Sequence, residues 1–320
     1  MSAASPPASP VLSLPPEITA EIFVFSLPAS PELRGLAGLS SPSLFLQLCR
    51  LWRDIALGTP ALWSSINVDL EKSNDARRKR QLREYAPFVE AIVLHVSRWQ
   101  HLDIGVPRAS FPDITAPMPL LLSAAVDWRD DPDTSQQTTS VAPPVPIFQS
   151  APNLRTVSLD FEYNPYTRPL PWSQITTLTA QCYPVDAIHI LDQTTALETC
   201  ALIVYSDGYP VPAGHRVPPL TQLRSFSLEW GEGCPDPDGR PQLFDALTLP
   251  VLDSLVVTEY FLGPDPIAAL ARVRPRGYPR KMHILDAWMS PEVYEQAFPD
   301  VEVKVRVESL KIYYSGGGVG

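Results

Sequence analysis

Residues 223–228 read Leu-Arg-Ser-Phe-Ser-Leu, in which three apolar residues are separated first by two residues and then by one. The same pattern occurs six more times along the chain, at start-to-start spacings of 21 to 33 residues. The other copies begin at Trp99, Leu121, Leu154, Ile175, Leu197 and Leu252. Alternation at the last two apolar positions is the period of a strand with one buried face, so each copy predicts one short β-strand.

A single copy is too small to bury its apolar face, whereas stacked copies form a continuous core. The spacing falls in the period range of leucine-rich repeats with insertions. Most copies lack the asparagine or cysteine that closes a regular repeat, so the predicted array is degenerate. Helices are predicted between strands at 186–191, 267–273 and 290–298, and further strands at 281–285 and 301–307.

A second pattern lies between Leu14 and Trp63 and predicts two short helices with a wide apolar surface. Two prolines occupy the first turn of the first helix, and Pro28 ends it. Ile18, Ile22 and Phe25 share one face of that helix, because they are four and seven residues apart. The second helix is predicted over residues 43–57. Such a surface either packs on the rest of the chain or docks on a partner.

These N-terminal residues resemble the F-box, in the form common among fungal, basidiomycete-like F-box proteins. The resemblance rests on Leu14-Pro15-Pro16-Glu17-Ile18 followed by Ile22-Phe23, then Cys49-Arg50-Leu51-Trp52-Arg53-Asp54-Ile55-Ala56, then Thr59-Pro60-Ala61-Leu62-Trp63. The connection over residues 28–42 is longer than in compact F-boxes. Short sequence motifs at 97–102, 170–175 and 247–252 resemble the repeat arrays of the same family. This weaker resemblance extends to about residue 307.

The pattern and the resemblance together predict the fold class, α+β to α/β repeat. A small N-terminal helical F-box would be followed by an irregular leucine-rich-repeat-like β/α solenoid. The predicted organisation is a disordered N-terminus (1–11), an F-box-like helical domain (12–65), a helical linker (66–92), the degenerate repeat domain (93–310) and a Gly-rich tail (311–320).

The resemblance implies a function without bond chemistry, that of a substrate-recruiting subunit of a Skp–cullin–F-box ubiquitin ligase. The F-box would dock on the Skp adaptor, and through it on a cullin, while the repeats bind a client protein of unknown identity. The residues that match the family's docking positions are Leu14, Pro15, Ile18, Ile22, Phe23, Cys49 and Trp52. The alternatives are a helical hairpin packed on its own domain, a non-proteolytic repeat scaffold and, more remotely, an enzyme with an unrecognised site.

The composition of the chain limits the classes of partner that we expect it to bind. A net charge of −10 disfavours nucleic acid and anionic lipid, and the basic run at residues 77–80 is expected to be a solvated helix face. The 37 prolines favour many short elements joined by turns. The first ten residues do not resemble a secretory signal, and apolar runs are too short for a membrane span. The expected location is therefore the cytoplasm or the nucleus.

Catalytic and metal motifs are not recognised in the sequence. The five histidines lie in no catalytic phrase, and the four cysteines are not at metal-ligand spacing. Cys182 and His189 are seven residues apart across a predicted turn, and Asp236 to Gly239 are expected to be a turn rather than a calcium loop. We therefore expect no cofactor, no metal and no enzymatic activity. Core or edge packing is expected for the tryptophans, although Trp128, Trp230 and Trp288 could be exposed hot spots.

Overall fold

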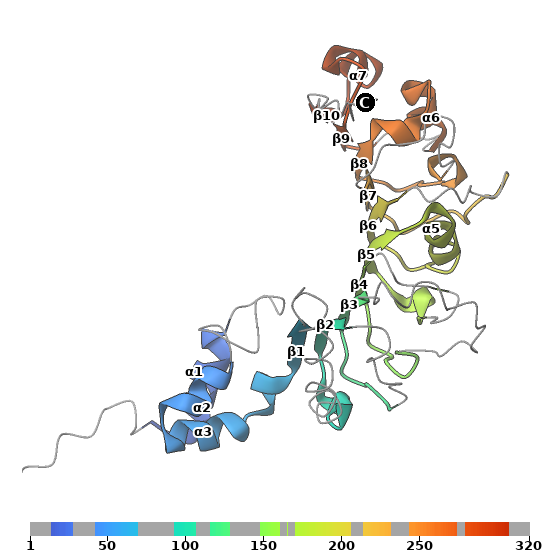
Figure 1. Ribbon diagram of the computed structural model, residues 1–320. Helices are drawn as coiled ribbons and strands as arrows, with labels where there is room; N and C mark the ends of the chain where they lie inside the picture. Colours follow the sequence, from blue (N-terminus) through green and yellow to red (C-terminus); the bar gives the residue numbers. More distant parts are fainter. Residues whose placement is uncertain are drawn as a thin grey trace, which may run out of the picture. The chain divides into compact units, whose positions relative to one another are not determined.

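The computed structural model describes residues 14–27, 42–69, 93–106, 116–128, 148–160, 165, 170–205, 214–231, 243–273 and 279–306. The predicted disordered N-terminus, most of the linker with its basic run, the turn at 236–239 and the Gly-rich tail lie outside these residues. The chain divides into two compact units, residues 1–171 and 172–320. Each unit is considered by itself, and the elements of both are labelled in Figure 1.

The first unit begins with helices α1 (Pro16–Ser26), α2 (Phe45–Leu48) and α3 (Arg50–Leu57), with 3₁₀ turns at Pro42–Leu44 and Pro60–Trp63. Helix α1 starts at Pro16, so only one of the two prolines predicted in its first turn is helical, and Pro15 is the residue that caps the helix. The single helix predicted over 43–57 is wrong. Cys49 is extended, with φ −156° and ψ 168°, and its Sγ accepts a hydrogen bond from the Trp52 backbone N–H at 3.5 Å. This contact caps α3, so the chain is helical on both sides of Cys49 but not through it.

A small aromatic cluster holds these helices together. The rings of Phe23 and Phe45 stack at a centroid distance of 4.1 Å, and Trp52 meets Phe23 edge-on at 4.9 Å. Trp63 folds back onto α3, where its Nε1–H donates to the Ala56 carbonyl at 2.9 Å. The last turn of α3 is thereby tied to the turn that follows it.

Every strand pair within each unit is parallel and follows chain order. The first unit contains β1 (Ser65–Asp69), β2 (His101–Val106), β3 (Ser123–Trp128) and β4 (Thr156–Leu159). The second contains β5 (Thr177–Cys182), β6 (Thr199–Val204), β7 (Ser225–Trp230), β8 (Ser254–Thr258), β9 (Lys281–Leu285) and β10 (Glu302–Arg306). Its helices are α5 (Pro184–Leu191), α6 (Pro266–Val273) and α7 (Pro291–Ala297).

The repeated apolar pattern sets the register of these strands. In the second unit its middle position aligns Leu178, Cys200, Phe226 and Leu255 across four neighbouring strands. All four side chains are at most 2% exposed. Backbone pairing starts before the strands do, since the N–H groups of residues 198, 224 and 253, each one residue before a strand, donate to the carbonyls of 176, 198 and 224. Each of these turns is therefore hydrogen-bonded to the turn before it.

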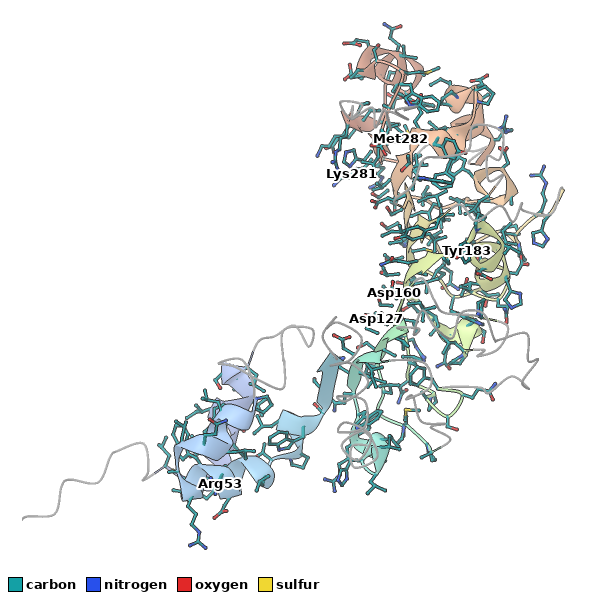
Figure 2. All side chains as sticks on the ribbon, in the orientation of Figure 1. Arg53, Asp127, Asp160, Tyr183, Lys281 and Met282 are labelled. Carbon is teal, nitrogen blue, oxygen red and sulfur yellow. The ribbon has the colours of Figure 1, made fainter. Side chains whose placement is uncertain are left out.

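The two faces of the second unit differ. Helices α5 and α6 lie on one side of the strands (Figure 1), and the apolar rows are buried toward that side. On β9, Met282 is 2% exposed whereas its neighbour Lys281 points away and is exposed (Figure 2). Parallel sheets usually carry cover on both faces, so a face of half-exposed and exposed side chains is a departure from the common arrangement.

The predicted fold class is wrong. The structure shows an α/β fold of all-parallel strands with few helices, and the described residues show neither a clear F-box helical bundle nor a leucine-rich-repeat solenoid. Strands β2 to β10 were predicted at about the right places, but β1 was not, since residues 66–69 were expected to belong to a helical linker. Pattern alone also could not supply a repeating unit around the strands. The connection from β7 to β8 has only the 3₁₀ turn Phe244–Ala246 among its described residues, whereas α-helices follow β5, β8 and β9.

Gly231 provides a test of the packing at the end of β7. A methyl group there would lie 2.6 Å from Tyr205 Cδ1, and the Tyr205 hydroxyl donates to Gln181 Oε1 at 2.9 Å. We expect Gly231→Ala to lower the free energy of unfolding by about 1–2 kcal/mol, as overpacking does, measured by urea denaturation. In the double variant Gly231→Ala/Tyr205→Ala the two effects should not add. Additive effects would show that the ring does not restrict this position.

Candidate docking surface

Helix α1 has one side in the helical cluster and one side in solvent. Thr19 and Phe23, four residues apart, are 3% and 1% exposed and face the cluster, together with Leu27 beyond the helix end. Ile18 and Ile22 lie on the opposite side and are 46% and 48% exposed. The helix therefore buries only part of its apolar surface within its own unit.

The exposed apolar surface of the helical segment is broad. Large hydrophobic side chains that are 37% to 85% exposed occur on α1 or just before it, on α2 and on α3: Leu14, Ile18, Ile22, Phe25, Leu48, Leu51 and Leu57. They all lie within 44 residues of sequence. An exposed aliphatic residue is unremarkable by itself, but a group this dense is typical of an interaction site.

The seven residues matched to a docking role separate into two groups. Leu14, Pro15, Ile18 and Ile22 are exposed, as docking requires. Phe23 is buried under Phe45, so its aromatic ring belongs to the cluster and does not face a partner. Cys49 and Trp52 are half-buried and have structural contacts of their own, the helix cap and the edge contact with Phe23.

The structure adds residues that the matched positions omit. Phe25 is 85% exposed, and the seven-residue spacing from Ile18 already places it on the same side of α1. Leu48 and Leu51, 55% and 44% exposed, lie on either side of the break at Cys49. No sequence signal distinguished them from core residues, because the predicted continuous helix had too many apolar positions to assign.

Charged side chains border this apolar surface. Glu17 and Glu21 are exposed on α1, next to the outward row. On α3, Arg50 and Arg53 are exposed, and the Arg53 Nε–H donates to the Leu46 carbonyl at 2.8 Å. A partner that contacts these helices would therefore meet apolar side chains together with acidic groups on α1 and basic groups on α3.

The structure gives Cys182 and His189 no catalytic arrangement. Cys182 is buried on β5, and burial raises the pKa of its thiol, with Asp186 adding to the effect. Burial lowers the pKa of His189, and Asp192 partly opposes this. A thiol kept protonated is a poor nucleophile, so this pair does not support an acyl-transfer site.

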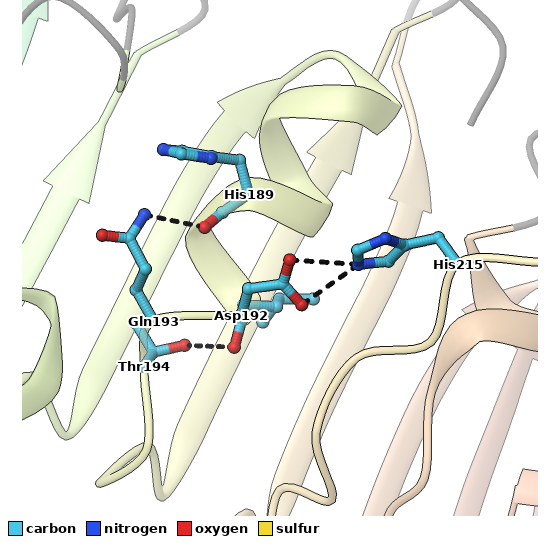
Figure 3. A network of polar contacts seen from close by, with 6 residues as sticks. His189, Asp192, Gln193, Thr194 and His215 are labelled. Atoms are coloured by element: carbon cyan, nitrogen blue, oxygen red, sulfur yellow. Dashed lines mark hydrogen bonds and ion pairs between the residues drawn. The ribbon is translucent and has the colours of Figure 1, made fainter. Parts of the chain in front are cut away.

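The polar groups around His189 tie together the end of α5 and the segment that precedes β7 (Figure 3). His215 Nε2 lies 3.0 Å and 3.2 Å from the two carboxylate oxygens of Asp192. Gln193 Nε2–H donates to the His189 carbonyl at 2.9 Å, and the Thr194 hydroxyl to the Leu191 carbonyl at 3.4 Å. These bonds satisfy the helix end and fix the neighbouring loop.

The tryptophans follow the expectation in part. Trp99 and Trp172 are both 2% exposed and fill core positions. Trp230 packs in an aromatic group with Tyr260 at 4.8 Å and Phe261 at 5.5 Å. Trp288 is 63% exposed, so the core or edge packing expected for it is wrong. The Trp128 side chain lies outside the described part of the structure.

Within the described part of the chain, histidine, cysteine, aspartate and glutamate side chains form no group of three that could hold a metal ion. Among the same residues, no helix combines the length and the apolarity that a bilayer crossing requires.

Comparison with models of protein families finds no match to this sequence, and comparison with curated proteins finds no relative.

Two adjacent residues of α1 test the division of this helix. Phe23→Ala should raise the amide hydrogen-exchange rate of residues 16–26 strongly, because deleting a buried aromatic ring costs about 3 kcal/mol. Ile22→Gln should change that rate little, since glutamine is a good helix former at an exposed position. Mass-spectrometric exchange on both variants measures the difference. Equal protection losses would contradict the assignment of Ile22 to the solvent side.

Proposed function

We propose that this protein is a non-catalytic adaptor subunit that docks through its N-terminal helical segment on a Skp adaptor of a Skp–cullin–F-box ubiquitin ligase. The observation that carries the proposal is the exposed apolar row of α1, Leu14, Ile18, Ile22 and Phe25. Three of these four residues coincide with docking positions of the F-box pattern. The support comes from the residues and their exposure, because the helices do not form a clear F-box bundle.

The parallel-strand part of the chain would bind the client protein. Tethering a client beside the ligase raises the effective concentration of its lysines at the conjugating enzyme, so the adaptor accelerates the reaction without touching a bond. Assembly of this kind occurs in the cytoplasm or the nucleus. No cofactor or metal is needed for this role.

A non-proteolytic scaffold is the second candidate function, and the exposed apolar row of α1 supports it as well. The exposed row would suit any partner with an apolar groove, since helix-in-groove recognition needs only anchors at this spacing. The two candidates differ in what happens to proteins bound by the rest of the chain. If proteins that co-purify with it keep their half-lives when it is depleted from cells, the scaffold is supported and the ligase subunit is not.

Docking is tested with the full-length chain co-expressed with a fungal Skp adaptor. We expect a stable complex, and we expect Ile18→Asp/Ile22→Asp to weaken it by at least about a hundredfold, as the loss of two central apolar anchors would. Isothermal titration calorimetry on the purified proteins measures the dissociation constants.

Leu94→Asp is the matched control, because Leu94 is 81% exposed and lies outside the helical segment. This variant should bind as tightly as the unaltered chain. Unchanged affinity in the Ile18→Asp/Ile22→Asp chain, or no complex with a folded unaltered chain, would refute docking through α1.

A further inference from the structure

We propose that the loop after β9, with its exposed Trp288, and the basic strip on β9 and β10 form a binding site for an acidic peptide segment that carries one bulky apolar residue. As the client site of an adaptor, this proposal rests on the function proposed above. Its physical case, however, comes entirely from the second unit.

The first observation is the exposure of the Trp288 indole. It is 63% exposed, although tryptophan is among the largest apolar side chains and is usually kept mostly from water. Val293, 41% exposed, lies five residues further on, in the first turn of α7. Tryptophan is also the residue most enriched among the energetic centres of binding interfaces.

The second observation is that the backbone under Trp288 is held by a buried carboxylate. Glu259 is 2% exposed, and its Oε2 accepts hydrogen bonds from the N–H groups of Trp288 at 2.7 Å and of Met289 at 3.4 Å. Asp286, at the start of the loop, has φ +49°, in the left-handed region that non-glycine residues rarely adopt.

Burying a carboxylate is costly unless hydrogen bonds compensate it. Here the Glu259 carboxylate fixes the backbone of a loop whose largest side chain, Trp288, is mostly exposed to solvent. Burial raises the pKa of Tyr294, and the nearby Glu259 carboxylate raises it further, which is consistent with a water-poor site beneath the loop. A preorganised anchor loses less conformational entropy on binding than a mobile one.

The third observation is the charge beside this loop. The Ala287 N–H donates to the Arg306 carbonyl at 3.3 Å, so the loop adjoins the end of β10. Register pairs Lys281 of β9 with Glu302 of β10, and Lys304 and Arg306 follow Glu302 at alternate positions, so all four side chains share one face. The ion pair between Lys304 and Glu302, at 3.3 Å, is exposed and therefore weak.

These charges determine the kind of ligand. The whole chain carries a net charge of −10, so an acidic peptide is repelled from the average surface and attracted to this basic strip. Helix α7, which follows Trp288 in the sequence, exposes Glu292 and Glu295. An acidic segment would therefore lie over β9 and β10, with one apolar side chain on the indole and Val293.

Binding is measured by fluorescence anisotropy with the full-length chain and a labelled pool of twelve-residue peptides. The pool carries four Asp or Glu residues and a central Phe, Leu or Trp. One matched pool has Ala at the centre, and another has Lys in place of the acidic residues. We expect the acidic pool with the bulky centre to bind at least tenfold more tightly than either matched pool.

The variants identify the surface. Trp288→Ala should weaken binding at least tenfold, and Trp288→Phe should weaken it less, because an aromatic ring remains. Lys281→Glu/Lys304→Glu should weaken binding about tenfold and reduce its dependence on salt. Val251→Ala is the control, since Val251 is 36% exposed elsewhere in the second unit, and should bind normally.

Three results would overturn the proposal. If Trp288→Ala binds the acidic pool with a dissociation constant within twofold of that of the unaltered chain, the indole is not part of the site. If the Ala-centred pool binds as tightly as the pool with the bulky centre, the peptide needs no bulky apolar residue. Tighter binding of a twelve-nucleotide uridine RNA, with the same sensitivity to Lys281→Glu/Lys304→Glu, would show that the strip is a nucleic-acid site instead.

The Ile18→Asp/Ile22→Asp chain separates this proposal from adaptor docking. It should bind the acidic pool like the unaltered chain, because neither residue belongs to the second unit. Failure of adaptor docking with intact, Trp288-dependent peptide binding would overturn only the docking proposal. Intact adaptor docking without Trp288-dependent peptide binding would overturn only the present one.

Discussion

Parallel backbone pairing in chain order is the constraint on which the rest of the structure depends. Within each unit every strand pairs with its sequence neighbour, and in the second unit the pairing extends into the turn before the strand, as between Glu198 N–H and the Thr176 carbonyl. Because the register is continuous, one apolar residue per strand is enough to build a buried row such as Leu178, Cys200, Phe226 and Leu255. Slipping a strand by one residue would turn its apolar side chains outward, so pairing and burial enforce each other.

The stability of the helical segment depends on side-chain packing rather than on strand pairing. It is too small to bury all the apolar surface it carries, and the aromatic stack of Phe23 on Phe45 accounts for much of its core. What remains, above all the row that includes Ile22 and Phe25, stays in contact with water. Surface of this kind is stabilised further only by association, which is why a docking role is a physical inference from the segment and not only one from its resemblance to the F-box.

The second unit concentrates its unusual features near its last strands. A buried carboxylate, Glu259, is placed where it holds a loop, and the loop presents Trp288 to solvent. Beside it, β9 and β10 expose lysine and arginine in a chain that is otherwise acidic. Burying a carboxylate and leaving an indole in water are each unfavourable by themselves, so stability alone does not account for these arrangements.

The sequence by itself determined where β2 to β10 lie, because alternation of apolar residues such as Phe226 and Leu228 is a local signal of a strand. It did not reveal β1, which lies where a helical linker was predicted. Residue spacing also predicted that Ile18, Ile22 and Phe25 share one face of α1, but not that this face is exposed. The tertiary structure alone decided the rest: that Phe23 is core while Ile22 is surface, that the chain is extended at Cys49, and that the strands belong to an α/β fold with few helices. The burial of Phe23 and the pairing of the strands depend on contacts between residues distant in sequence, as between Phe23 and Phe45, and a single sequence carries no signal of which distant residues meet. The extended Cys49 depends on a local cap, the contact of its sulfur with the Trp52 N–H, which the apolar pattern of the helix did not reveal.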